Sequence, residues 1–394
     1  YMNINIYGST GVIGKKTLDI IKKKFPKIKV NLLCANTNVE IILKQIIKHN
    51  PKYVYLDNKK ASLKLKHKLI KKTRKTKILS FSELKNYLRN SKSDFSILAI
   101  SGYKSLYYLE PIINNTKNLG IVSKEAIVSA GHIFKKKNFF KKTKIFPLDS
   151  EHFSIFDSYY SLENFKTKFK NNEIKKIILT ASGGPFYKKK FSSLKNVSFK
   201  EAICHPKWNM GYKNSIDSAT LVNKCLEIIE AHYIFDVPFN KISTLIHPEA
   251  LVHSIIEKSN YTTKFNLFKN DMSIPIINFL TLSQYSQFDT FSNLHLSKIS
   301  NLSFSNVLEE YFPIYKFFVN LDKSNPANLI KFNVGNEYAV NMFRDNLIKY
   351  TDIYKIIKKV CSLNLYYPLK TINEVIDYHE KLESKIKIVF KKYN

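Results

Sequence analysis

Two carboxylates stand two positions apart, directly after an apolar run of the sequence. They are Asp149 and Glu151 in Asp149-Ser150-Glu151-His152, which follows residues 144–148. The apolar run predicts a strand, and side chains at i and i+2 of an extended segment project to the same side. The two carboxylates could therefore converge on a hard divalent cation beyond the carboxyl end of a strand. The alternative is an acidic helix N-terminus, with Asp149 or Ser150 as the cap and Glu151 in the first turn.

A second polar cluster is expected between residues 205 and 230, where the pattern predicts a helix from about Ser218. In such a helix Asn223 and Glu227 stand at i and i+4, and Lys224 and Glu227 at i and i+3, so the three share a face. That face suits a phosphorylated, hydroxylated ligand together with a metal. Taken alone, Lys224 and Glu227 are better explained as an ion pair at the surface.

Two glycine-containing loops could bind phosphate groups. Gly8, Gly11 and Gly14 directly follow the first predicted strand and open an amphipathic helix, as in a dinucleotide-binding turn, although their spacing differs from GxGxxG. The alternative is an ordinary glycine-rich turn between a strand and a helix. Residues 182–185, Ser-Gly-Gly-Pro, could bring backbone donors and a hydroxyl to a second phosphate, or form only a turn.

The residues after the second predicted strand bear on the choice of cofactor. Enzymes that use NAD place an acid there, which binds the ribose diol. This chain has Ala35-Asn36-Thr37-Asn38 instead. Without the acid a 2′-phosphate is not repelled, so the sequence favours NADP over NAD.

These residues need a scaffold, and the pattern of the chain predicts one of the α/β class. Short apolar runs alternate with amphipathic stretches over the first 150 residues, which indicates an N-terminal, Rossmann-type, doubly wound parallel sheet. We expect three domains, covering residues 1–150, 151–300 and 311–394, and the last has helical periodicity without a clear strand signal. The strands are expected at residues 3–7, 29–34, 53–56, 95–100, 119–122 and 144–148.

Composition narrows the possible partners. The net charge is +33, yet only 3 of the 64 basic residues are arginine, the residue that usually reads phosphates and bases. Lysine is spread along the whole chain, so we expect a biased genome composition rather than a nucleic-acid partner. The 4 cysteines form no CxxC pair, and no apolar run is long enough for a membrane span. We expect a soluble protein of the bacterial cytoplasm, although a processed plastid-type protein would look the same.

Six motifs together resemble one family. They are GSTGVIG at 8–14, SKEA at 123–126, LDSEH at 148–152, ASGGPF at 181–186, HPKWNMG at 205–211 and DSATLVNKCLEIIEA at 217–231. In order and spacing, over essentially the whole chain, they are similar to the 1-deoxy-D-xylulose 5-phosphate reductoisomerases.

The resemblance implies an activity and an architecture. The family converts 1-deoxy-D-xylulose 5-phosphate to 2-C-methyl-D-erythritol 4-phosphate on the non-mevalonate route to isoprenoid precursors, with NADPH and Mg²⁺, Mn²⁺ or Co²⁺. Its members are homodimers with a Rossmann domain, an α+β catalytic domain with a lid, and a C-terminal helical domain. In this chain the lid would lie near residues 182–212 and would contain Trp208 and Met210.

The resemblance also implies roles for individual residues. The metal would be held by Asp149, Glu151 and Glu227. The catalytic residues would be Lys124, Glu151, His205 and Glu227. Substrate would be bound by Lys124, Ser150, Glu151, Ser182, His205, Ser218, Asn223, Lys224 and Glu227. The cofactor would be bound by Thr10, Gly11, Val12, Ile13, Asn36, Thr37, Asn38, Ser123, Glu125 and Gly211.

Departures from the family's pattern all fall near the expected cofactor. Ser123 replaces the usual Asn before the Lys-Glu pair, residues 36–38 replace a common Gly-Lys-Asn, and Val12 replaces the usual Ser of the first loop.

Two rival hypotheses also follow from the sequence. One is an acyl-phosphate or semialdehyde dehydrogenase that uses Cys204 or Cys225 as its thiolate; the other is a basic nucleic-acid-binding protein with a Rossmann fold and no turnover.

Overall fold

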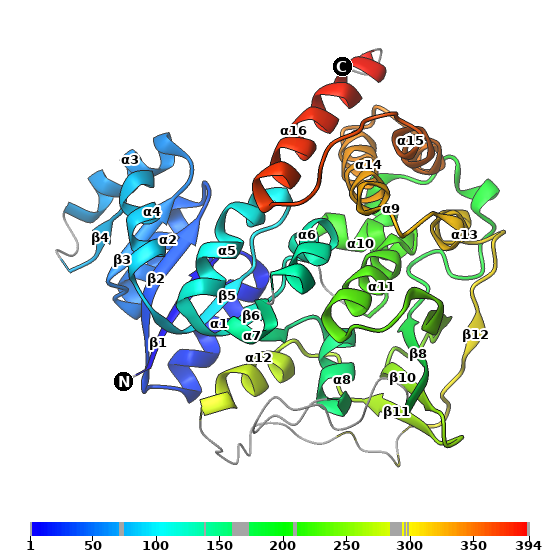
Figure 1. The fold of residues 1–394 in the computed structure, drawn as a ribbon, viewed down its shortest axis with the longest axis horizontal. Helices are drawn as coiled ribbons and strands as arrows, with labels where there is room; N and C mark the ends of the chain where they lie inside the picture. Colours follow the sequence, from blue (N-terminus) through cyan, green and yellow to red (C-terminus); the bar gives the residue numbers. More distant parts are fainter. Residues whose placement is uncertain are drawn as a thin grey trace. The chain divides into compact units, whose positions relative to one another are not determined.

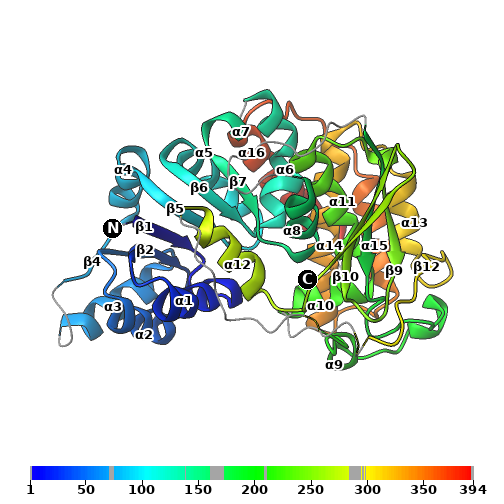
Figure 2. The same cartoon turned by 90° about the horizontal axis from the view of Figure 1, so that it is seen from below.

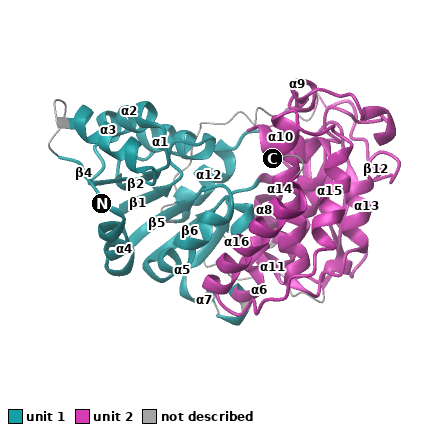
Figure 3. Cartoon of the chain, turned by 90° about the horizontal axis from the view of Figure 1, so that it is seen from above, with its two compact units in different colours: residues 1–126, 134–149, 271–286 teal, residues 127–133, 150–270, 287–394 magenta. Residues whose placement is uncertain are grey.

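The computed structural model describes residues 2–70, 75–137, 139–159, 173–207, 211–283, 294, 297 and 299–391. The chain forms two compact units, coloured separately in Figure 3. Unit 1 comprises residues 1–126, 134–149 and 271–286, and unit 2 comprises residues 127–133, 150–270 and 287–394. The part of the expected lid that contains Trp208 and Met210 lies outside the described residues.

Unit 1 is built on a seven-stranded sheet in which all neighbouring strands are parallel (Figure 1). The strand order is β4-β3-β2-β1-β5-β6-β7, so the direction of winding reverses between β1 and β5. Ligands of doubly wound sheets bind outside the carboxyl ends of the strands at such a point. The strands are β1 (Met2–Tyr7), β2 (Ile28–Ala35), β3 (Tyr53–Leu56), β4 (Lys77–Ile78), β5 (Ser93–Leu98), β6 (Thr116–Ile121) and β7 (Lys144–Pro147).

Helices cover both faces of this sheet. Figure 2 shows α1, α2 and α3 on one face and α4 and α5 on the other, and Figure 3 agrees. Successive residues of β1, Ile4, Asn5 and Ile6, are therefore all buried. The helices and 3-10 turns of this part of the chain are α1 (Val12–Lys24), α2 (Val39–His49), α3 (Lys59–Ile70), α4 (Phe81–Asn90), η1 (Tyr103–Ser105), α5 (Leu106–Asn115), α6 (Lys124–Lys136), α7 (Phe139–Lys142), α12 (Ser273–Leu280) and η5 (Thr281–Ser283).

Unit 2 contains a second sheet, with the order β11-β10-β8-β9-β12. Strands β8 and β9 are parallel, and the other pairs are antiparallel. The strands are β8 (Ile174–Ala181), β9 (Ile242–Ile246), β10 (Val252–Lys258), β11 (Thr263–Leu267) and β12 (Ser305–Asn306). The helices and 3-10 turns are α8 (Ser150–Tyr159), η3 (Phe191–Leu194), α9 (Phe199–Ala202), α10 (Tyr212–Ala219), α11 (Val222–Phe235), η4 (Phe239–Lys241), α13 (Pro313–Asn320), α14 (Pro326–Arg344), α15 (Asp352–Cys361) and α16 (Ile372–Val389).

Helix α11 lies in the interior of unit 2. It contacts β8 and β9 as well as α13 and α14. Of its 14 residues 11 are buried, including Lys224, Glu227 and Glu230. Because a helix that is buried all round exposes no polar face, its charged side chains must find partners inside the protein.

The parallel sheet and the C-terminal helices expected from the sequence are present, and the helix predicted from about Ser218 is present too but begins later than expected. Ser218 lies near the end of α10, and α11 begins only at Val222. Between them Leu221 has a φ of 64°, a left-handed conformation that breaks the helix. Among the described residues, no helix combines the length and apolar character needed to cross a bilayer.

Candidate active site

The carboxylates singled out in the sequence lie close together. One oxygen from each of Asp149, Glu151 and Glu227 lies within 4.8 Å of the other two, and no other such group of three His, Cys, Asp or Glu residues occurs within the described ranges. The extended geometry predicted for Asp149 and Glu151 is wrong, because α8 begins at Ser150 and Glu151 occupies its first turn. The alternative of a helix N-terminus therefore describes the backbone, and the carboxylates converge all the same.

Lys224 lies between two of these carboxylates. Its Nζ is 2.8 Å from Glu151 Oε1 and 2.5 Å from Glu227 Oε2, and only 3% of the residue is exposed. Burial alone would lower the pKa of Lys224, but the charges and hydrogen bonds of the two glutamates outweigh it and raise the pKa above its ordinary value. Lys224 is therefore an ammonium, and the surface ion pair considered for Lys224 and Glu227 is instead a buried network.

Further polar side chains fix the orientation of each carboxylate. Lys124, at the start of α6, places its Nζ 2.7 Å from Asp149 Oδ2. Asn223 donates a hydrogen bond to Glu227 Oε1, and Ser150 Oγ donates one of 2.5 Å to Glu151 Oε2. Each of the three acids thus has a donor besides any bound ligand, and that donor fixes its orientation.

His152 also helps to build the acidic group, a role that the sequence did not reveal. It is fully buried on α8, and its Nε2 forms a 2.9 Å hydrogen bond with the backbone oxygen of Glu227. The contact ties α8 to α11 and so fixes the separation of Glu151 and Glu227. The only signal in the sequence was its place at the end of the LDSEH motif, since its partner stands 75 residues away.

A second cluster gathers around His205. Its Nε2 lies 3.1 Å from Ser182 Oγ and 3.0 Å from Ser218 Oγ, and its Nδ1 accepts a hydrogen bond from the backbone N–H of Lys207. Burial lowers the pKa of His205 to about 4; Glu151 opposes this effect and Lys224 adds to it. At neutral pH the ring is uncharged, and because Nδ1 accepts, Nε2 carries the hydrogen and donates it.

The loop that contains Ser182 depends on its two glycines. Gly183 and Gly184 have φ angles of +86° and +69°, which glycine adopts without strain. A Cβ on Gly184 would lie 2.9 Å from Ala219 Cα at the end of α10. The close approach brings Ser182 and Ser218 to the same histidine, although they come from different elements.

The first glycine loop of unit 1 has the backbone expected of an anion-binding turn. Gly8 has a φ of +94°, and a Cβ there would lie 2.3 Å from the backbone oxygen of Ala99. Helix α1 begins at Val12 with no side-chain cap and no acid in its first turn. The N–H of Gly11 closes the turn onto Gly8, whereas among the described hydrogen bonds none uses the N–H of Thr10, Val12 or Ile13. These three groups are available to an anion at the helix N-terminus.

The other positions expected near the cofactor have clear local roles. Asn38 Oδ1 caps α2 by accepting from the N–H of Ile41, and Asn36 and Thr37 precede it in the turn after β2. Ser123 Oγ donates to the backbone oxygens of Ile100 and Leu98, at 2.5 and 3.2 Å. These contacts commit the side chains of Asn38 and Ser123 to the fold. Of the two remaining positions, Glu125 is buried in α6 and Gly211 is the exposed cap of α10.

Family models match three consecutive parts of the chain. They are 1-deoxy-D-xylulose 5-phosphate reductoisomerase over residues 4–131, its C-terminal domain over residues 145–235, and the DXP reductoisomerase C-terminal domain over residues 267–385. The reductoisomerase of Sulfurihydrogenibium sp. is 36% identical over 392 residues, which cover 100% of this chain and 99% of the relative. The chain belongs to the 1-deoxy-D-xylulose 5-phosphate reductoisomerase family. The apicoplastic reductoisomerase of Plasmodium falciparum is 34% identical, covering 100% of this chain and 84% of the relative.

Solved structures of the reductoisomerase family have the same fold. A DOX-P reductoisomerase in complex with NADPH, fosmidomycin and magnesium has a TM-score of 0.90 and 27% identity, covering 100% of this chain and 98% of its own. The enzyme from Zymomonas mobilis, in complex with NADPH, has a TM-score of 0.84 and 27% identity, with 98% of each chain covered. The expected α/β class with a Rossmann-type sheet is thereby confirmed.

The thiolate chemistry of the rival dehydrogenase hypothesis has no support in this reductoisomerase fold. Cys225 is fully buried in α11, and burial raises its pKa well above the ordinary value, so it stays a neutral thiol. Cys204 is exposed, and its Sγ donates to the backbone oxygen of Lys200. Buried and neutral, Cys225 is not the thiolate that a nucleophile must be.

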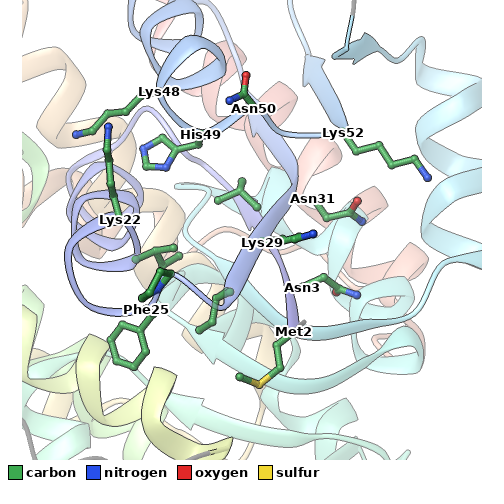
Figure 4. Close-up of a pocket in the computed structure, with 14 residues that line it drawn as sticks. Met2, Asn3, Lys22, Phe25, Lys29, Asn31, Lys48, His49, Asn50 and Lys52 are labelled. Carbon is green, nitrogen blue, oxygen red and sulfur yellow. The ribbon is translucent and has the colours of Figure 1, made fainter.

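A basic hollow of about 630 Å³ lies elsewhere in unit 1, at the amino ends of β1 and β2. Figure 4 shows Lys22, Lys48 and His49 around it. These residues belong to the last turns of α1 and α2, where cations complement the negative end of the helix dipole. Burial, then Lys48 and Lys22, lower the pKa of His49 to about 4. The charges of Lys22 and Lys48 are thus explained by the helix ends, and we assign no ligand to this hollow.

Proposed function

We propose that this chain carries out the family reaction, the NADPH- and divalent-metal-dependent isomerisation and reduction of 1-deoxy-D-xylulose 5-phosphate to 2-C-methyl-D-erythritol 4-phosphate, in the non-mevalonate route to isoprenoid precursors. The observation that carries the proposal is the convergence of Asp149, Glu151 and Glu227 beside the buried ammonium of Lys224. The reaction needs a hard cation and a binding site for a phosphorylated sugar. The three carboxylates offer ligands to the cation, and the ammonium of Lys224 offers a positive charge to the sugar phosphate.

The residues present fit a divalent metal. Three carboxylates are the oxygen donors that Mg²⁺ and Mn²⁺ prefer, and Co²⁺ also accepts them. When bound, the ion supplies Lewis acidity to the substrate's oxygens. Lys224 and Lys124 neutralise part of the carboxylate charge without taking up all of the oxygens. We therefore assign Asp149, Glu151 and Glu227 as the ligands.

The side chains around these ligands are suited to hold the sugar phosphate. Ser182, His205 and Ser218 form one cluster of hydroxyls and a neutral imidazole, from which Nε2 donates. Four residues beside the carboxylates offer further donors to substrate hydroxyls or phosphate. These are Lys124, Ser150, Asn223 and Lys224. Of all these groups, we assign catalytic contacts to Lys124, Glu151, His205 and Glu227.

The first glycine loop is suited to hold NADPH. The backbone N–H groups of Thr10, Val12 and Ile13 can bind its pyrophosphate. NADPH supplies the hydride when bound. Residues 36–38 follow β2 without an acid, so they do not repel the 2′-phosphate. We assign Gly11, Ser123, Glu125 and Gly211 to the same cofactor site.

We also propose how the activity is organised along the chain. Residues 1–150 would bind the nucleotide, residues 151–300 would carry the metal, the dimer contact and a lid near 182–212, and residues 311–394 would form the helical domain. The family resemblance supports a homodimer in the bacterial cytoplasm, with a processed plastid-type protein as the alternative. Light scattering at the working concentration measures the mass in solution; a monomer that turns over substrate would contradict the dimer.

The proposed reaction is tested by following NADPH oxidation with 1-deoxy-D-xylulose 5-phosphate, with and without Mg²⁺ or Mn²⁺. We expect turnover that needs the metal and is lost in Glu227→Gln. The matched control is Glu310→Gln, which removes a carboxylate paired with Lys190 at 3.0 Å but outside the metal group. Folded, metal-loaded protein without turnover would contradict the proposal, and salt-dependent DNA affinity in its place would favour the nucleic-acid-binding alternative.

A further inference from the structure

Helix α10 carries a buried acid that plays no part in the metal group. Asp217 is 1% exposed, and each of its oxygens has a donor. Lys213 Nζ lies 2.8 Å from Oδ2, one turn earlier in the same helix, and Asn336 Nδ2 donates a 2.7 Å hydrogen bond to Oδ1. Asn336 is fully buried and belongs to α14, so a residue of the C-terminal helices fixes α10 through its acid.

The other end of α10 is held by the same partner helix. Tyr212, the first residue of α10, donates from its hydroxyl to Asn341 Oδ1 at 3.1 Å and accepts from Arg344 Nη1 at 2.9 Å. The guanidinium of Arg344 also lies over the Tyr212 ring, 5.3 Å from its centre. Helix α14 thus contacts α10 near both of its ends.

The residue after Asp217 belongs to the proposed substrate site. Ser218 Oγ lies 3.0 Å from His205 Nε2. Successive side chains of a helix point about 100° apart, so Asp217 can bond to α14 while Ser218 faces His205. A rotation of α10 by roughly 20° would move a side chain at the helix surface by about 2 Å. The hydrogen bond from Asn336 to Asp217 lies where it would oppose such a rotation.

We propose that Asn336 is a positioning residue for the sugar phosphate: by fixing Asp217, it sets the rotation of α10 and the place of Ser218 beside His205. The inference rests on the proposed function. Leaving a buried carboxylate without one of its donors costs free energy, and the carboxylate regains a partner by turning toward water. That rotation of α10 would carry Ser218 away from the substrate. Asn336 would thus act on substrate binding without touching the substrate.

The test is Asn336→Leu, which keeps the size of the side chain and removes the donor. We expect the KM for 1-deoxy-D-xylulose 5-phosphate to rise about tenfold, the loss typical of one hydrogen bond to a charged group. The KM for NADPH should stay unchanged. Tyr212 still holds the first turn of α10, and this turn follows Gly211, which we assign to the cofactor site. The control is Asn333→Leu on the same helix. Asn333 is 1% exposed, and its side chain has no hydrogen-bond partner among the described residues, so both KM values should stay unchanged.

The outcomes separate this inference from the proposed function. If the wild-type chain turns over substrate and Asn336→Leu leaves the substrate KM unchanged, or raises both KM values equally, the positioning role is overturned. If the wild type shows no turnover, the proposed function itself fails. Should Asn336→Leu not fold, Lys213→Met removes the other donor to Asp217 from a side chain that is 19% exposed. It should raise the substrate KM alone, and an unchanged value would equally overturn the role.

Discussion

The acidic group around Glu151 and Glu227 in unit 2 and the glycine loop of unit 1 use opposite means to bind charge. Around Glu151, Lys224 and Glu227, charge is bound by charged side chains, and each of them lies within 3 Å of an opposite charge. The glycine loop instead offers backbone N–H groups; it needs Gly8 for its positive φ and has no acidic side chain in the first turn of its helix. Side-chain chemistry constrains which residue stands at each position, whereas backbone chemistry constrains only the glycines.

This contrast bears on one of the departures that the sequence resemblance implies, Val12 in the first glycine loop. Val12 is 55% exposed at the start of α1, and what it offers an anion is its N–H, which any residue except proline has. The two regions should therefore respond to substitution differently, and each can be disabled without the other.

The largest effect is expected from Glu151→Gln. An amide is a poorer ligand than a carboxylate for a hard cation, so metal-dependent turnover should fall by roughly a thousandfold, as when a group that stabilises transition-state charge is removed. Affinity for NADPH should be unchanged, as measured by its fluorescence on binding. Equal losses of Mn²⁺ and NADPH affinity would show that the two regions are not independent.

Gly8→Ala makes the converse change in the glycine loop. The added Cβ would lie 2.3 Å from the Ala99 oxygen in a backbone that only glycine adopts without strain. We expect the free energy of unfolding to fall by roughly 2 to 4 kcal/mol and NADPH affinity to fall with it. Denaturant titration and NADPH binding check both effects. The folded variant should still bind Mn²⁺, and loss of Mn²⁺ as well would contradict the division of roles.

His205 gives a smaller effect with a defined pH dependence. Its folded pKa, about 4, lies below the unfolded value of about 6.5. Protons therefore favour the unfolded chain, and stability falls as pH drops from the unfolded pKa toward the folded one. His205→Gln should lose less stability than the wild type over that range, and should raise the substrate KM about tenfold at neutral pH. A substrate KM that titrates near pH 6.5 in the wild type but not in His205→Gln would show that His205 keeps the pKa of an exposed histidine.

The smallest effect is expected from Val12→Ser, which restores the usual family residue. Because the contact uses the backbone N–H, the KM for NADPH should change by less than about twofold, within the range of exposed substitutions. Steady-state kinetics at saturating substrate measure it. A tenfold gain in NADPH affinity would mean that the side chain, and not only the backbone, contacts the cofactor.

Much of the scaffold could be predicted because its signals are local. The buried residues Ile4 and Ile6, or Phe95 and Ile97, stand in short apolar runs separated by amphipathic stretches. The break at Leu221 could not be predicted, since leucine gives no signal for a positive φ.

The candidate site was predictable in its residue types but not in its environment. An i, i+3 pair such as Lys224 and Glu227 is normally exposed, and only the packing of α11 between the second sheet and the C-terminal helices buries it. His152 and Asn336 escaped notice because their partners, Glu227 and Asp217, stand 75 and 119 residues away.

The most direct test of the central claim measures Mn²⁺ binding and turnover in the same titration. Bound Mn²⁺ is counted by electron paramagnetic resonance while NADPH oxidation is followed with 1-deoxy-D-xylulose 5-phosphate present. We expect turnover to rise in step with one bound ion per chain, and we expect Glu227→Gln to lose both bound ion and turnover while Glu310→Gln keeps both. Turnover by the metal-free protein, or Mn²⁺ still bound with full affinity in Glu227→Gln, would contradict the central claim.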